Sequence, residues 1–289
     1  MPYAHPEALV DGSWLAARLG DPRLRIVDGS FKLPGVVPTA RADYETGHIP
    51  GAVFFDIDDI AMPGTSLPHM VPSAGRFAQK MAALGIGDDD MVVVYDAAGL
   101  SSAGRAWWML RLFGHDRVAV LDGGLPQWRA EGRPLTTAVP SPPAARFTAR
   151  FDPTLLRDKA ALLANLATGA EQVVDARAAG RFEGSAPEPR PGIRRGHIPG
   201  SRNLPYERLT DPTTRRVRGA EELAALFDEA GVTRDRPVVT SCGSGVTACA
   251  LAFALYLIGH ERAAVYDGSW SEWGLFGDTP IKTGPAARN

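Results

Sequence analysis

The chain has 289 residues, of which 45% are hydrophobic, so it can bury a large core and its length favours two domains. The 31 basic and 33 acidic side chains leave a net charge of -2, which gives no electrostatic basis for binding nucleic acid or an anionic membrane. Two cysteines cannot build a disulfide framework, which fits a reducing compartment.

Signals for targeting and for bound cofactors are missing from the sequence. The N-terminal segment MPYAHPEALVDGSW has no basic region followed by an apolar one, so we expect no secretory or transit peptide. The longest apolar run, residues 248–258, is too short to span a bilayer. We therefore expect a cytoplasmic protein. Without metal-ligand spacing or a nucleotide-binding glycine fingerprint, we predict no metal and no cofactor.

The first half of the chain alternates short strands with helices. A strand ending in aspartate at residues 26–28 (IVD) precedes the sequence GHIPG at 47–51. A second strand at 92–95 (VVVY) is followed by a helix over 103–113, and AVLDGGLPQW at 119–128 predicts a third strand and a turn. This alternation favours an α/β domain with a small, mainly parallel sheet and helices on both faces.

A linker and a second copy follow. Residues 134–153, rich in proline, alanine and threonine, predict an extended segment on the surface. Beyond it GHIPG returns at 196–200, again after a strand ending in aspartate. Collinear repetition over half the chain indicates two copies of one domain. We assign residues 1–136 to an N-terminal domain without cysteine, predicted to be non-catalytic, residues 137–153 to the linker, and residues 154–289 to a C-terminal domain with the catalytic cysteine.

The most informative stretch is residues 237–259, PVVTSCGSGVTACALAFALYLIG. It predicts a strand, a tight loop holding Cys242, and an apolar helix. Gly243 and Gly245 let the loop turn its N–H groups inward, and the helix dipole adds its positive end there. Such a loop favours a thiolate, so Cys242 is the candidate nucleophile, the alternative being an inert buried cysteine. Cys249 is expected to pack in the core.

Comparing the two copies separates structural residues from candidates for chemistry. His48 pairs with His197 and His115 pairs with His260, so we expect these four to serve the fold. In contrast, Cys242 falls opposite Asp96 or Ala97 in the first copy, which therefore cannot use cysteine chemistry.

Other unpaired side chains extend this candidate site. His69 has no counterpart, and Asp58 can orient it, unless that carboxylate is merely solvated or caps a helix. Ser244 either hydrogen-bonds within the cradle or caps the following helix. The loop 181–197, absent from the first copy, carries Arg181, Arg190, Arg194 and Arg195. One or two of these are expected to clamp a small carboxylate, the alternative being a solvated charged loop.

Over nearly its whole length the chain resembles the sulfurtransferases with tandem rhodanese domains. The resemblance rests, in chain order, on both GHIPG copies, FFDID, WWML, LDGG, the linker, the GRFEG and PEPR loop, and CGSGVTA. CGSGVTA is similar to the 3-mercaptopyruvate branch, whereas the thiosulfate branch typically has basic side chains directly after the cysteine. One departure is the stretch DAAGLSSAGRA between Tyr95 and Trp107, where the family often carries an aromatic residue.

The resemblance implies roles for individual residues. Cys242 is the sulfur-accepting nucleophile, Ser244, His69 and Asp58 form a catalytic set, and Arg181 and Arg190 bind the substrate. The remaining substrate-binding positions are those of the loop after the cysteine, Gly243, Gly245, Val246 and Thr247. Since His69 and Asp58 belong to the first copy, the site is expected between the domains.

The implied function is transfer of sulfane sulfur from 3-mercaptopyruvate, through a persulfide, to cyanide or a thiol acceptor such as thioredoxin, with release of pyruvate. The alternatives are a thiosulfate:cyanide sulfurtransferase on the same scaffold and a non-catalytic persulfide carrier. A cysteine phosphatase is disfavoured because it needs an arginine six residues after the cysteine, where this chain has Ala248.

Overall fold

Two parallel five-stranded sheets, one from each half of the chain, form the framework of the protein. The computed structural model describes residues 2–275 and 277–286. The sheets have the strand orders β1-β5-β4-β2-β3 and β6-β10-β9-β7-β8, and every pairing is parallel. This confirms the predicted duplicated α/β fold. The strands are β1 (Leu9–Val10), β2 (Leu24–Asp28), β3 (Ala52–Phe54), β4 (Met91–Tyr95) and β5 (Val118–Leu121), then β6 (Leu156–Arg157), β7 (Gln172–Asp175), β8 (Arg202–Asn203), β9 (Val238–Ser241) and β10 (Ala263–Tyr266).

Helices cover both faces of each sheet. Three separate clusters of buried apolar side chains fill the space between sheets and helices. In the first half the helices are α1 (Gly12–Ala16), α2 (Ala40–Thr46), α3 (Ile57–Ile60), α4 (Ala74–Ala83), α5 (Ala103–Leu112) and α6 (Gly124–Ala130). In the second half they are α7 (Lys159–Thr168), α8 (Ala179–Glu183), α9 (Ala220–Glu229), α10 (Ala248–Leu257) and α11 (Ser269–Trp273), and short 3-10 turns lie at Pro6–Ala8, Pro153–Leu155 and Tyr206–Leu209.

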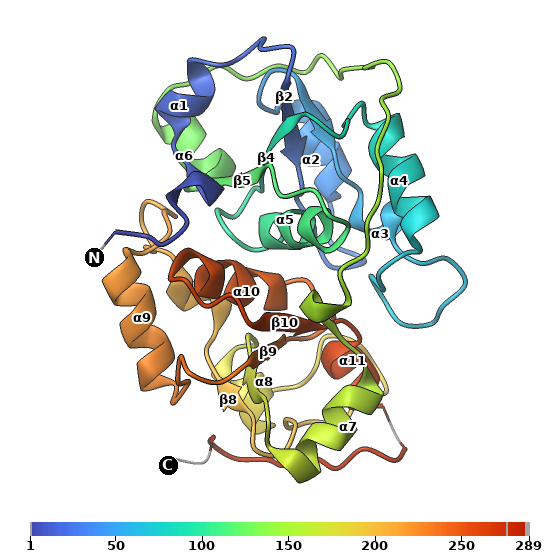
Figure 1. Cartoon of the computed structure of the whole chain (residues 1–289), viewed down its shortest axis with the longest axis vertical. Coiled ribbons are helices and arrows are strands. Elements are labelled where there is room, and N and C mark those ends of the chain that lie inside the picture. Colours follow the sequence, from blue (N-terminus) through green and yellow to red (C-terminus); the bar gives the residue numbers. More distant parts are fainter. Residues whose placement is uncertain (1, 276, 287–289) are drawn as a thin grey trace.

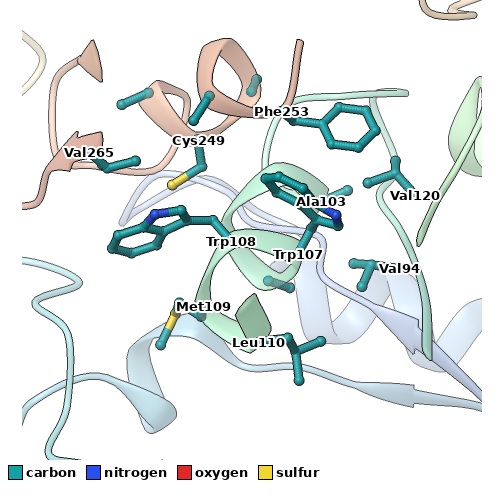
Figure 2. Packing of buried hydrophobic residues seen from close by; sticks show 14 of the residues in the cluster. Val94, Ala103, Trp107, Trp108, Met109, Leu110, Val120, Cys249, Phe253 and Val265 are labelled. Carbon is teal, nitrogen blue, oxygen red and sulfur yellow. The ribbon is translucent and has the colours of Figure 1, made fainter. Parts of the chain in front are cut away.

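The two halves share one core along a seam between α5 and α10, which lie against each other at the centre of the molecule (Figure 1). Trp107 of α5 meets Phe253 of α10 edge to face, with ring centroids 4.9 Å apart. Figure 2 shows this contact beside Trp108 and Cys249. Gly104 is needed here, because a Cβ on it would come within 2.9 Å of the backbone N of Ala250. The closely packed helices therefore fix one domain against the other.

The segment joining the halves is extended, as predicted. Between α6 and Pro153, a stretch that the structure describes completely, the chain forms no helix and no strand beyond an isolated bridge from Thr136 to His48. Figure 1 shows it running over the outside of the N-terminal half. Backbone hydrogen bonds hold it there. The Ala145 N–H donates to the Ala82 carbonyl at 3.0 Å, and the Arg150 N–H donates to the Phe113 carbonyl at 2.8 Å.

His48 and His197, one of the two predicted histidine pairs, have structural contacts. His48 Nδ1 lies 2.7 Å from the Tyr44 carbonyl oxygen, and its ring stacks on Tyr44 with centroids 4.0 Å apart. His197 repeats this arrangement with Phe182, at 2.9 Å and 3.8 Å. Each histidine therefore anchors its GHIPG turn to the preceding helix.

Candidate active site

The Cys242 loop leaves the carboxyl end of β9 and enters α10. Its position follows from strand register, since Asp175 pairs with Ser241 in β9 as Asp28 pairs with Tyr95 in β4. The sequence left Asp96 and Ala97 as possible counterparts of Cys242 in the first copy, and this register identifies Asp96. Cys242 is only 2% exposed.

Backbone contacts hold the Cys242 loop from one side and leave its N–H groups free on the other. The Cys242 N–H donates to Ser269 Oγ at 3.1 Å, and its carbonyl accepts the Trp270 N–H at 2.9 Å. Within the described part of the chain, the N–H groups of residues 243–247 have no protein acceptor. The loop thus offers unpaired donors of the kind that bind an anion.

A cavity of about 260 Å³ opens above this loop. The C-terminal domain supplies Cys242, Gly243, Ser244, Val246 and Thr247 to its lining, together with the arginine-rich loop. The N-terminal domain supplies Phe31, Leu33 and Ser101. Ser101 belongs to the stretch that departs from the family pattern, so that stretch still reaches the site. The cavity therefore lies between the domains, as expected.

Two of the four loop arginines line the cavity. The guanidinium of Arg181 lies so close to Gly243 that a Cβ there would be 2.9 Å from Nη2, and Glu188 Oε2 accepts from the same nitrogen at 2.5 Å. Arg190 is half-buried, and this burial is the main cause that lowers the pKa of its guanidinium. Arg194 instead donates to backbone carbonyls of Trp273, Gly274 and Thr279, and Arg195 is exposed. The arrangement agrees with a substrate role for Arg181 and Arg190 alone.

His69 and Asp58 meet behind Arg190. His69 Nδ1 lies 2.8 Å from Asp58 Oδ1, and His69 is only 4% exposed. Arg190 Nη2 lies 3.1 Å from His69 Nε2. Because an arginine can only donate, Nε2 is the acceptor and Nδ1 carries the proton that faces Asp58. The hydrogen bond from His69 is the largest cause that lowers the pKa of the Asp58 carboxyl, so this carboxylate stays ionised.

The predicted catalytic set is brought together only in part. Ser244 lines the cavity beside Cys242, but no hydrogen bond joins it to His69 among the described residues, and His69 is not itself a lining residue. Gly245, predicted to bind substrate, likewise lies outside the lining. Its φ of 75° and the 2.6 Å that would separate a Cβ from the Asp267 carbonyl oxygen explain why this position is glycine.

Cys249 packs in the core, as expected. It is fully buried, and its Sγ lies 3.2 Å from the Gly245 carbonyl oxygen. Burial raises the pKa of its thiol to about 12. Cys249 therefore stays protonated at neutral pH, unlike a nucleophile.

Several charged residues near the site, among them Arg105 and Glu188, were not singled out from the sequence. Arg105 of α5 is completely buried and reaches the Cys242 loop, and Glu188 joins Arg177 to Arg181 with its carboxylate. For Arg105 a signal exists in the sequence, because this charged residue interrupts an apolar helix and its counterpart in α10 is Ala250. Glu188 has no such signal, since nothing in a loop sequence shows which arginine a carboxylate will meet.

Comparison with known proteins identifies the class to which this fold and site belong. A family model for the rhodanese-like domain matches residues 11–131 and again residues 158–275, so the chain belongs to the rhodanese-like family.

Individual relatives are sulfurtransferases. The chain is 44% identical over 274 residues to the human 3-mercaptopyruvate sulfurtransferase, covering 92% of this chain and 91% of the relative. It is 42% identical over 298 residues to the mitochondrial thiosulfate/3-mercaptopyruvate sulfurtransferase 1 of Arabidopsis thaliana, covering 96% and 78%. The crystal structure of SseA from Escherichia coli, a 3-mercaptopyruvate sulfotransferase, superposes with a TM-score of 0.83 at 39% identity, covering 91% of this chain and 98% of SseA.

Residues 2–275 and 277–286 contain neither a membrane-spanning helix nor a cluster of metal-binding side chains. No helix there is long and apolar enough to cross a membrane. Nor do three or more histidine, cysteine, aspartate or glutamate side chains gather there in a way that can hold a metal ion.

Proposed function

We propose that this protein is a 3-mercaptopyruvate sulfurtransferase that carries sulfur on Cys242. The observation that supports this most directly is the interdomain cavity, in which the cysteine loop of one domain lies with two arginines and adjoins a His-Asp pair of the other. The names of the human and Arabidopsis relatives support the same donor.

In this proposal the two arginines bind the substrate carboxylate in different ways. Arg181 is held in place by Glu188, which offsets part of its charge. Among residues 2–275 and 277–286 no carboxylate contacts Arg190 directly. Because its guanidinium faces His69 instead, it makes the stronger bond to the substrate. The substrate's sulfur then lies toward Cys242.

The chemical step is attack of the Cys242 thiolate on that sulfur. An S–S bond forms between enzyme and substrate sulfur, the substrate's C–S bond breaks, and its electron pair leaves with pyruvate as the enolate. The free N–H groups of residues 243–247 stabilise the negative charge on the persulfide. Protonation of the enolate carbon by the proton that was on the substrate thiol completes the balance and gives pyruvate.

His69, Asp58 and Ser244 move this proton. A carboxylate bound to Arg190 competes with His69 for the hydrogens on Nη2. Once that bond passes to the substrate, Nε2 becomes free to accept from the Ser244 hydroxyl, while Asp58 keeps the ring oriented. This exchange accounts for a histidine that faces Arg190 rather than Ser244.

The persulfide passes its outer sulfur to a thiol acceptor such as thioredoxin, or to cyanide in an assay. A cytoplasmic location remains our prediction and is supported by two cysteines that form no disulfide. The division into residues 1–136, 137–153 and 154–289 is likewise proposed, and the two matched family ranges fall on either side of the linker.

The test is steady-state pyruvate release from 3-mercaptopyruvate, set beside thiocyanate formation from thiosulfate and cyanide. We expect a higher kcat/KM with 3-mercaptopyruvate, because Gly243 and Ser244 place no side-chain cation directly after the cysteine to hold a departing sulfite. A preference for thiosulfate would identify the alternative sulfurtransferase. Loading of sulfur onto Cys242 without turnover of either donor would instead identify a carrier.

A further inference from the structure

We propose that Arg105, acting through its ion pair with Asp267, is a positioning residue that holds His69 and the Cys242 loop in register across the domain seam. This inference rests on the proposed function, because it assigns a role in the same site. Arg105 belongs to α5 of the N-terminal domain and Asp267 follows β10 of the C-terminal domain.

The guanidinium of Arg105 contacts three elements of the site at once. Its Nη1 donates to the Gly245 carbonyl at 3.1 Å, and its Nη2 donates to the His69 carbonyl at 2.5 Å. The same Nη2 lies 2.8 Å from Asp267 Oδ1, and both side chains are almost fully buried, at 0% and 5% exposure. The rigid fork of an arginine is suited to hold several acceptors in one fixed geometry.

Asp267 also binds the backbone near His69, at Val71. Its Oδ2 accepts the Val71 N–H at 2.7 Å, so the ion pair holds the backbone on both sides of residue 70. His69 has a φ of 61°, in the left-handed region that a non-glycine residue rarely adopts. Such a conformation persists only where the surroundings fix it, and these bonds do so.

The internal repeat separates a role in docking from a role in the site. Asp122, the counterpart of Asp267, accepts the Val217 N–H at 2.7 Å, and Val217 precedes α9 by the same number of residues as Val71 precedes α4. Each domain therefore has a carboxylate that accepts a backbone N–H of the other domain, and we call each of these contacts a carboxylate clamp. Only the clamp next to Cys242 contains a buried arginine, because Ala250 stands in α10 where Arg105 stands in α5. Because the Asp122 contact forms without an arginine, docking of the domains does not require one. We therefore assign Arg105 a role in the site.

Loss of Arg105 should misplace the proton-transfer group rather than weaken substrate binding. Arg181 and Arg190 do not contact Arg105, so KM should change little. A displacement of His69 by about 1 Å is enough to cost ~10²-fold in rate. The expected signature is thus a fall in kcat at nearly constant KM.

The experiment compares Arg105→Met, Arg105→Lys and Asp267→Asn with Asp122→Asn as the matched control, each checked by urea unfolding. We expect Arg105→Met and Asp267→Asn to lower kcat for 3-mercaptopyruvate by roughly 10- to 100-fold, Arg105→Lys to recover part of it, and Asp122→Asn to keep the wild-type kcat while it loses stability. Equal kcat losses in Asp267→Asn and Asp122→Asn would overturn the proposal, and Asp267→Asn and Arg105→Lys carry the test should Arg105→Met not fold.

A second readout does not depend on the proposed activity. In ¹⁵N-histidine spectra, with the His69 signals assigned from a His69→Gln sample, Arg105→Met and Asp267→Asn should shift the His69 ring nitrogens and Asp122→Asn should not. Unchanged His69 signals would reject the positioning role. A wild-type protein that releases no pyruvate would reject the proposed function alone.

Discussion

The loops after β4 and after β9 occupy equivalent places in the two domains. They differ in whether their backbone N–H groups already bind an anionic side chain of the protein. In the first, the Asp96 carboxylate accepts five backbone N–H groups of its own loop, those of residues 98, 99, 101, 102 and 103, at 2.7–2.8 Å. In the second, Cys242 replaces the aspartate, and the N–H groups of residues 243–247 find no protein acceptor in the described chain.

This difference fits the proposal that one copy of the scaffold is structural and the other catalytic. The turn between a parallel strand and a helix creates donors that need an anion. A permanent internal carboxylate satisfies them and makes the first loop rigid. In the proposed mechanism, the Cys242 loop has no such carboxylate, so its N–H groups stay available to the negative charge that develops during the reaction.

The largest expected effect comes from removing the sulfur atom that distinguishes the second loop. Cys242→Ser should reduce pyruvate release to the background rate, since no other thiol can accept sulfur, and it should abolish the mass increase of one sulfur atom after exposure to donor. Cys249→Ser is the control and should keep activity because that thiol is buried and protonated. Retained turnover in Cys242→Ser would contradict the proposed mechanism.

The next largest effect tests whether His69 of the N-terminal domain contributes proton transfer to the reaction at the Cys242 loop. His69→Ala should lower the rate with 3-mercaptopyruvate by ~10²–10⁴-fold, the usual contribution of acid-base catalysis. The rate with thiosulfate should fall far less, because sulfite leaves without a proton. Parallel measurement of both donors decides the matter, and equal losses would exclude a proton-transfer role for His69.

A smaller effect separates the two arginines that only the second domain carries. Arg190→Met should lower kcat/KM for 3-mercaptopyruvate by about 10- to 100-fold, corresponding to the roughly 1.5–3 kcal/mol of a charge-assisted hydrogen bond. Arg181→Met should cost less, because Glu188 already offsets its charge. The reverse order of the two losses would show that Arg181 is the main carboxylate ligand.

The smallest effect on activity is expected from the first loop. Asp96→Ala removes the acceptor of five backbone N–H groups, three of them in buried hydrogen bonds, and should destabilise the protein by about 2–4 kcal/mol in urea unfolding. The folded variant should keep most of its turnover, since Asp96 does not line the cavity. Asp96→Asn should lose less stability. A variant that stays as stable as the wild type would show that the carboxylate is not what holds this loop.

Much of this architecture was predictable because local patterns repeat. The strands after Pro237 and before GHIPG, the helix that begins at Ala248 and the linker all have clear periodicity or composition, and the duplication tests each assignment twice. The symmetry argument also singled out His69, whose catalytic role is proposed, and it identified His48 and His197 as structural.

The contacts within the site were less predictable. The family resemblance implied that Ser244, His69 and Asp58 act as one set, whereas in this structure Arg190 donates to His69 Nε2. For Gly245, nothing in the sequence indicated that its carbonyl accepts a hydrogen bond from Arg105. Side chains that are distant in sequence compete for the same hydrogen-bond partner, and only their positions in space decide which one makes the bond.

By itself the sequence determined that the chain contains two copies of an α/β domain, that one of them carries a cysteine in a glycine-containing loop, and which residues break the symmetry. These properties depend on periodicity, turn chemistry and repetition, all of which are local. Only the tertiary structure decided that Asp96 fills the cradle of the first domain and that Arg105 and Asp267 fix His69 beside the second. Both depend on buried charges, whose cost must be met by partners that folding brings from distant parts of the chain.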